Sequence, residues 1–396
     1  MRRALSARLD TTTTGRNTSH PMRPPEPPVR RGAPRPEPER GRDGGQQHPG
    51  SEAHAHPNPG AVGDIPLPRV VAVRVVVIGA GGIGGSIGAR LHQSGYDVAL
   101  VARGAHGAAI QERGLTFATP EERVTLRIPT YARPDELTWT SDDVVVLATK
   151  SQDTEAAALD LFGAAGPDVP VVSAQNGVAN EQALSRWFAH VHGMCVMMPT
   201  AHLEPGVVMA HSAAATGILD LGRFPAGTDD VDEAVAEALR ASRIESVPRP
   251  DIMRWKYRKL LNNLGNAVQA LCGTQLDTDA ARDILDLLVA EAEQAFAAAG
   301  IDAVTEAEDD VRRADHLQLR PVAGEPRGGG STWQSLQRGK AVETDFLNGE
   351  IALLGRVYGV ATPANAEVQR LMREAVTHGA GPGSMTAAEL LSGLER

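Results

Sequence analysis

The sequence has few of the residues that would indicate a secreted or membrane-bound protein. Only two of its 396 residues are cysteine, Cys195 and Cys272, so no disulfide framework is expected. No apolar run reaches the roughly 18 residues of a transmembrane helix, and no secretory segment opens the chain. The net charge of −10 argues against a nucleic-acid partner. Together these absences predict a reduced, cytoplasmic protein that binds no membrane.

Lysine is also scarce, and its placement is uneven. Of the 39 basic residues 35 are arginine, and lysine occurs only at Lys150, Lys256, Lys259 and Lys340. Lys256 and Lys259 lie within one turn of a predicted helix, "RWKYRKLLNNLGNAVQAL". Four lysines can be distributed in this way by chance. The alternative is that the protein needs, on this helix, a cation that can release a proton.

The first 70 residues differ in kind from the rest. They hold 13 of the 27 prolines and no aromatic residue, since the first is Tyr96. Such a segment cannot bury enough apolar surface to offset its ordering entropy, so residues 1–70 are predicted to be a disordered extension. An arginine-rich targeting or anion-binding arm is the alternative. His54 and His56 could hold a metal weakly, but solvated histidines are favoured and no metal site is predicted.

Residues 71–245 are predicted to form an α/β domain of the Rossmann type. The apolar run from Val73 to Ile78 is followed by a G-x-G-x-x-G motif, a helix from Ile83 to Gln93 and a strand from Asp97 to Ala102. In this context the motif predicts a dinucleotide site, in which glycines allow a tight turn, close approach of a pyrophosphate and helix–strand packing. The predicted cofactor contacts in this loop are Gly79, Gly81, Gly82, Ile83 and Gly84.

The ends of later strands carry further candidate ligands. Arg103 stands at the tip of the second strand, where NAD-binding units place an acid, and a cation there suits the 2′-phosphate of NADP. Lys150 and Asn176 follow the strands predicted over 144–149 and 169–174, and ligands bind at such strand ends. An ordinary surface arginine, a loop lysine and a helix cap are the alternatives.

Residues 246–378 are predicted to form an all-α domain, followed by a short tail over 379–396. Helices are expected over 252–271, 279–299, 340–358 and 363–377, the last behind a cap at Thr362. In the first of them Lys259, Asn263 and Asn266 lie at i, i+4 and i+7 and share one stripe. Asparagine is a poor helix former, so this stripe favours a polar cavity over a solvent-exposed face.

The lysines on this helix suggest a chemistry. Arginine keeps its proton at physiological pH, whereas a partly buried lysine releases one more easily. Reduction of a ketone needs a hydride on carbon and a proton on the developing alkoxide. A lysine in the cavity can stabilise that oxygen and protonate it.

These segments resemble the ketopantoate reductase family, also called 2-dehydropantoate 2-reductases. The resemblance runs from about Val73 to Ala375 and rests on "GAGGIG", "TK", "QNG", "RKLLNN" and "STWQSLQRGKAVETDFLNGEI". It implies a Rossmann domain and a helical domain related to 6-phosphogluconate dehydrogenase, with NADPH as hydride donor and a 2-oxo acid as substrate.

The resemblance also implies roles for single residues. Lys259 takes the position of the general acid, and Glu343 that of an acid which binds the substrate hydroxyl. Asn263 orients substrate, and Ser331 contacts its carboxylate. Lys150 and Asn176 match positions that contact cofactor and substrate. Arg103 lies near the position at which the family recognises the 2′-phosphate of NADP. From the residues alone, Glu343 can equally be an ordinary acid in a helical first turn.

Three positions depart from the family pattern and leave the substrate open. Ala267 stands where a second asparagine is frequent, Ser335 where an aspartate is common, and Trp333 where a smaller apolar residue is usual. A paralogous reductase of another 2-oxo or 3-oxo acid is one alternative, and a non-catalytic NADP(H)-binding sensor or scaffold is another. The sequence also leaves open whether the chain forms a homo-oligomer and whether Lys256 shares the role of Lys259.

Overall fold

The computed structural model describes residues 73–314, 316–324 and 326–394, all within the compact unit Pro66–Arg396. The extension predicted over residues 1–70, with His54 and His56, lies outside the described residues.

The N-terminal half is built on a twisted sheet that is parallel except at one edge. Valines in the first strands alternate between the two faces, so that Val75 and Val77 join one apolar core while Val76 joins another. Strands buried on both faces in this way are typical of α/β proteins. The sheet order is β11 (Ile218–Arg223), β8 (Val191–Met197), β7 (Val171–Ser173), β6 (Asp143–Leu147), β1 (Arg74–Ile78), β2 (Val98–Val101) and β5 (Thr130–Tyr131), with β11 antiparallel to β8.

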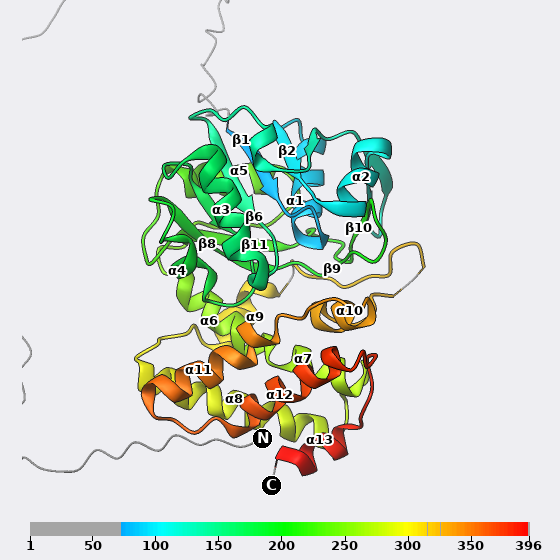
Figure 1. Ribbon diagram of the computed structural model, residues 1–396, viewed down its shortest axis with the longest axis vertical. Helices are drawn as coiled ribbons and strands as arrows, with labels where there is room; N and C mark the ends of the chain where they lie inside the picture. Colours follow the sequence, from blue (N-terminus) through cyan, green and yellow to red (C-terminus); the bar gives the residue numbers. More distant parts are fainter. Residues whose placement is uncertain (1–72, 315, 325, 395–396) are drawn as a thin grey trace, which may run out of the picture. The chain divides into compact units, whose positions relative to one another are not determined.

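Helices cover both faces of this sheet (Figure 1). The core on one face takes apolar residues from α1 (Gly82–Gln93), α2 (Gly104–Arg113) and α5 (Asp230–Ala241). The core on the other face takes them from α3 (Thr154–Ala165) and α4 (Asn180–Leu184). A second, smaller sheet has the order β4 (Arg123–Leu126), β3 (Leu115–Ala118), β10 (Val207–Ala210) and β9 (Thr200–Ala201).

The C-terminal half is helical. Its apolar core combines residues of α6, α7, α8, α11 and α12, and Figure 1 shows the last four of these gathered with α13. The α/β plus all-α fold class predicted from the sequence is confirmed. No helix in the described part of the chain is both long and apolar enough to cross a membrane. The helices are α6 (Ile252–Asn263), α7 (Gly265–Cys272), α8 (Asp279–Ala299), α9 (Glu306–Arg313), α10 (Ser331–Gln337), α11 (Asn348–Tyr358), α12 (Pro363–Thr377) and α13 (Ala387–Leu394).

Two predicted helices differ from the structure. The segment over 252–271 is divided at Leu264 into α6 and α7, although the backbone of Leu264 stays close to helical (φ −61°, ψ −33°). A Cβ at Gly265 would come within 2.9 Å of Leu285 Cδ2, so α8 packs closely against the start of α7. The helix predicted from Lys340 begins only at Asn348, after a positive φ at Gly339 and a 3-10 turn, η3 (Thr344–Phe346).

The start of α12 is capped from another helix. The side chain of Thr362 makes no capping hydrogen bond, contrary to the prediction. Instead the buried carboxylate of Glu291 in α8 accepts hydrogen bonds from the backbone N–H groups of Ala364 (2.8 Å) and Asn365 (2.9 Å). These bonds satisfy orphan donors of the first turn and join α12 to α8. The predicted tail also contributes, since Leu390 of α13 is buried in the helical core.

Candidate active site

The glycine loop after β1 opens into a cavity of about 240 Å³. The cavity lies at the carboxyl ends of β1, β2 and β6, where a parallel sheet binds ligands. Two of the predicted cofactor residues outside the loop, Arg103 and Lys150, line it. Its other lining residues include Gly79, Ala80, Gly81, Ala102, His106, Thr149, Asp153, Asp160 and His202.

The loop itself fits a dinucleotide. Gly79 has a φ of +96°, which favours glycine, and a Cβ at Gly84 would lie 2.1 Å from Gly79 O. Nothing lies within 4 Å of a Cβ built on Gly81, so the backbone there faces open space that a phosphate can approach. Two of the residues predicted to contact the cofactor, Gly82 and Ile83, do not line this first cavity. A Cβ at Gly82 would meet Thr200 Oγ1 at 2.7 Å, and Ile83 lines a second cavity.

The positive charge in this first cavity comes from Arg103 and Lys150 rather than from its histidines. His106 Nδ1 accepts a hydrogen bond from Gly206 N (2.8 Å), so its Nε2 carries the proton that is donated to Ala80 O (2.7 Å). Burial lowers the pKa of His106 and lowers the pKa of His202 to about 4. Arg103 is exposed, and within the described ranges no side-chain hydrogen bond or ion pair engages it. It is therefore free to meet an anion.

A second cavity, of about 680 Å³, gathers the polar residues predicted for the substrate. Ile83, at the start of α1, lines this cavity, and Gly81, two residues earlier, lines the first, so the two cavities lie near one another at this helix terminus. The lining includes the predicted residues Asn176, Lys259, Asn263, Asn266 and Ser331, together with Met197, Thr200, Asn262, Gln269, Asp310, Arg313 and Arg327.

Lys259 lines this second cavity. Burial lowers the pKa of Lys259 to about 8, and the positive charge of Arg313 adds to the effect. Among the described residues no hydrogen bond or ion pair engages its Nζ. An ammonium that is desolvated and unpaired at the wall of a cavity is a candidate proton donor.

Two asparagines beside this lysine are fixed by one another. Nδ2 of the buried Asn263 donates a hydrogen bond to Asn176 Oδ1 at 3.1 Å. This contact joins α6 to the loop after β7. In the described part of the chain no hydrogen bond engages Asn263 Oδ1 or Asn176 Nδ2, so both atoms are available to a ligand. Asn266 lies on α7, beyond the helix break, and still lines the same cavity.

Glu343 and Lys150 join the sheet edge to the segment before η3. The buried carboxylate of Glu343 accepts hydrogen bonds from Ser151 N (3.1 Å) and Ser151 Oγ (3.2 Å), and Glu343 lines neither cavity. Lys150 Nζ donates to Ser335 Oγ and to Ala341 O (3.1 Å). Burial lowers the pKa of Lys150, and the charge of Glu343 opposes this shift.

Lys256 has a different environment from Lys259. Its Nζ lies 2.6 Å from Glu181 Oε1 in a buried ion pair and donates to the backbone oxygens of Gln175 (2.9 Å) and Met194 (3.2 Å). These contacts tie α6 to α4 and to the sheet. Lys256 thus stabilises the junction between the two halves and lines neither cavity.

Cys195 is a core residue. It is buried in the middle of β8, and burial raises the pKa of its thiol to about 12, so the thiolate is strongly disfavoured.

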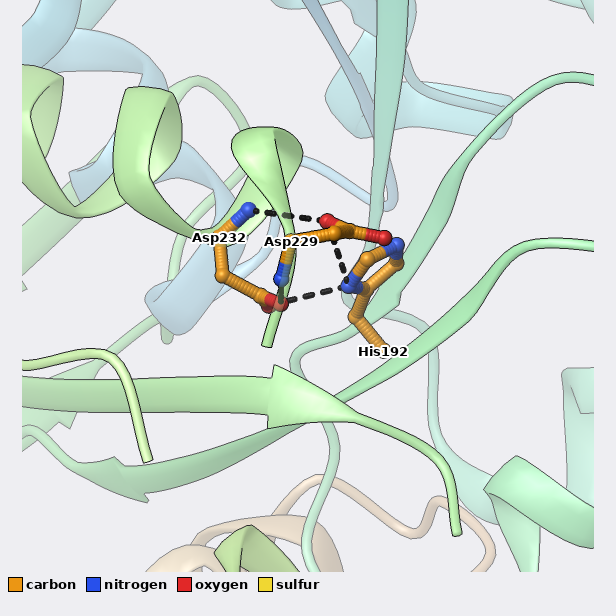
Figure 2. A group of neighbouring side chains, drawn as sticks. All are labelled: His192, Asp229 and Asp232. Atoms are coloured by element: carbon orange, nitrogen blue, oxygen red, sulfur yellow. Dashed lines mark hydrogen bonds and ion pairs between the residues drawn. The ribbon is translucent and has the colours of Figure 1, made fainter. Parts of the chain in front are cut away.

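Figure 2 shows another polar cluster, His192, Asp229 and Asp232. His192 Nδ1 lies 2.9 Å from Asp232 Oδ1 and 4.0 Å from Asp229 Oδ1. The carboxylates already form a capping box at the start of α5, because each accepts a hydrogen bond from the backbone N–H of the other residue. Asp229 also pairs with Arg223. The cluster is explained by capping and supports no metal site.

The sequence analysis missed several residues of the second cavity. Arg313 on α9 and Gln269 on α7 belong to its wall, as does Arg327 in the Gly-rich segment before α10. In the sequence, Arg327 is visible only as a single arginine within the Gly-rich stretch "GEPRGGGS". Trp333 and Ser335, two of the departures from the family pattern, do not line the cavity.

A Rossmann-type sheet with an open glycine loop, followed by a helical domain, is an architecture of nicotinamide-dependent oxidoreductases. Comparison with known proteins narrows the class. The model of the family described as ketopantoate reductase PanE/ApbA matches residues 75–226, and that of its C-terminal domain matches residues 251–376. The chain therefore belongs to the ketopantoate reductase family, and so to the oxidoreductases.

Individual relatives agree with this assignment. The 2-dehydropantoate 2-reductase of Pyrococcus horikoshii is 28% identical over 317 residues, which cover 78% of this chain and 99% of that protein. The ketopantoate reductase structure from Ralstonia eutropha JMP134 aligns with a TM-score of 0.66 and 27% identity, over 78% of this chain and 99% of that chain. D-mandelate dehydrogenase, solved with NADH and anilino(oxo)acetate, shares the fold at a TM-score of 0.67 and 22% identity, over 78% and 99%.

Proposed function

We propose that this protein reduces a 2-oxo acid with NADPH, and that 2-dehydropantoate (ketopantoate), reduced to pantoate, is its substrate. The observation that carries the proposal is the unpaired amine of Lys259, with a pKa of about 8, in a cavity whose lining comes within two residues of the dinucleotide cavity at the start of α1. The family membership supports the same reaction, because the relative from Pyrococcus horikoshii carries the name of this reductase.

The chemistry divides between the cofactor and the chain. When bound, the reduced nicotinamide supplies the hydride that the carbonyl carbon accepts. Lys259 donates a hydrogen bond to the carbonyl oxygen, and then transfers its proton as negative charge develops there. The lysine is left as a neutral amine, which its buried environment favours, and water restores the proton.

Neighbouring residues hold the substrate for this transfer. The free amide atoms of Asn176 and Asn263 can fix the carbonyl and hydroxyl groups, because their mutual hydrogen bond orients both side chains. Asn266 and the hydroxyl of Ser331 line the same cavity and are further substrate contacts in this proposal. Glu343 acts as a positioning residue, because its carboxylate holds Ser151, whose hydroxyl lies 3.3 Å from Asn176 O.

The preference for NADPH is assigned to Arg103. No acid lies at the end of β2 to bind a ribose 2′-hydroxyl. The exposed Arg103 lines the first cavity, and its guanidinium has no partner in the described ranges. Arginine binds phosphate oxygens through two parallel hydrogen bonds, which matches the 2′-phosphate of NADP.

The test is a substrate screen with the purified full chain. Ketopantoate and a set of other 2-oxo and 3-oxo acids are each mixed with NADPH or NADH, and nicotinamide oxidation is followed by its absorbance. We expect turnover with ketopantoate and a lower KM for NADPH than for NADH. Faster turnover of another oxo acid would identify a paralogous reductase. Tight NADPH binding without turnover of any oxo acid would instead indicate a sensor or scaffold.

A further inference from the structure

The second cavity contains a guanidinium that the proposed chemistry has not used. Arg327 lines this cavity, and its Nε is buried without a hydrogen-bond partner. Within the described residues no ion pair neutralises it. Arg313, the other arginine of the cavity, has a partner, because its Nε lies 2.7 Å from Asp309 Oδ2. Arg327 is therefore a partly buried positive charge without a counter-ion among the described residues, and it can accommodate an anion.

The backbone around Arg327 is held in place. Gly330 N donates a hydrogen bond of 2.5 Å to Gln269 Oε1 on α7. A Cβ at Gly329 would lie 2.2 Å from Trp333 Cγ, so the glycines let this segment lie directly on the indole ring. Trp333, where the family usually has a smaller residue, thus supports the segment that carries Arg327 instead of filling the cavity. An arginine presented from a fixed segment loses less entropy on binding.

Arg327 also acts on the candidate proton donor. Its positive charge is one of the causes that lower the pKa of Lys259, after burial and Arg313. In a 2-oxo acid the carboxylate is bonded to the carbonyl carbon. A site for this substrate must therefore place a carboxylate partner close to the group that protonates the carbonyl oxygen. Arg327 and Lys259 line the same cavity and so meet this requirement.

We propose that Arg327 binds the substrate carboxylate and so selects 2-oxo acids over uncharged ketones. This inference rests on the proposed function and adds to it a residue that determines the substrate class. The planar guanidinium can hold a carboxylate through two parallel hydrogen bonds, which the hydroxyl of Ser331 alone cannot provide. Displacement of water from the partly buried guanidinium strengthens the contact.

The test compares an acid with its uncharged ester. Arg327→Gln and a control, Arg320→Gln, each remove one positive charge, but Arg320 is exposed and lines neither cavity. For each variant kcat and KM are measured with the preferred 2-oxo acid and with its methyl ester. We expect Arg327→Gln to lower kcat/KM for the acid by at least about 30-fold, mainly through KM, and to leave the ester nearly unchanged. Arg327→Lys should recover part of the loss.

The proposal would be overturned if kcat/KM for the acid fell no more than kcat/KM for the ester in Arg327→Gln, so that the ratio of the two stayed unchanged. A binding measurement separates this inference from the proposed function. Oxamate, an inert analogue of a 2-oxo acid, is titrated by calorimetry into the NADPH complexes of the unaltered chain and of both variants. Loss of oxamate binding only in Arg327→Gln would support the inference even if no oxo acid were reduced. Equal oxamate binding by all three proteins would refute it even if ketopantoate reduction were observed.

Discussion

The pH dependence of the reductase reaction should report the environment of Lys259. In the reductive direction this side chain must start protonated. With a pKa of about 8, lowered from 10.5 by burial, it is protonated at pH 7 and mostly neutral at pH 9. We therefore expect kcat/KM for the oxo acid to be constant below about pH 7 and to fall about tenfold per pH unit above about pH 9. If the lysine had an unperturbed pKa, kcat/KM would stay unchanged up to about pH 10.

The assay follows NADPH oxidation from pH 6 to 10 at saturating cofactor, with the oxo acid varied. Oxidation of the hydroxy acid by NADP provides the mirror image, because Lys259 must then start neutral, and its rate should rise with pH through the same inflection. In Lys259→Arg the guanidinium keeps its proton, so the residual rate should lose this inflection. A reductive rate that stays flat to pH 10 in the unaltered chain, or that falls toward low pH, would refute the assigned role.

Two further predictions concern stability and cofactor choice. Because the folded state lowers the pKa of Lys259, protonation costs folding free energy below about pH 8, and this cost disappears as the pH rises toward 10.5. Lys259→Met should therefore raise the Tm by a few degrees at pH 7 and by much less at pH 10, in thermal scans monitored by circular dichroism; an equal gain at both values would show that the amine is not desolvated. Arg103→Gln should raise the KM for NADPH by about 10- to 100-fold, the value of a charge-assisted hydrogen bond, and leave the KM for NADH unchanged. A similar rise for both cofactors would mean that Arg103 does not contact the 2′-phosphate.

Much of the fold could be predicted because local signals coincide with it. The helices α8 and α12 begin and end at the predicted residues, since Gly300 ends the first and Pro363 opens the second. The division at Leu264 could not be predicted, because the apolar periodicity of the sequence continues through it and the backbone there stays close to helical. The segment before α11 is predicted from the sequence to be helical, but in the structure Glu343 there contacts Ser151, 192 residues away in the sequence, and no local pattern contains such a contact.

The candidate site shows the same division. Lys259 and Asn263 could be predicted to share a cavity, because helical spacing places them on one stripe. Glu343 could be identified by its sequence pattern, but that pattern carried no information about its engagement with Ser151. Arg327 lies in a segment without periodicity, so only the folded chain brings it to the cavity of Lys259.

The central claim is that Lys259 gives the proton that completes reduction. Its most direct test is NADPH oxidation by Lys259→Ala, with NADPH binding measured by fluorescence as the control for folding. The account predicts unchanged NADPH affinity, a loss of turnover of about two to four orders of magnitude, and partial recovery when a small primary amine is added to the buffer. Turnover close to that of the unaltered chain would contradict it.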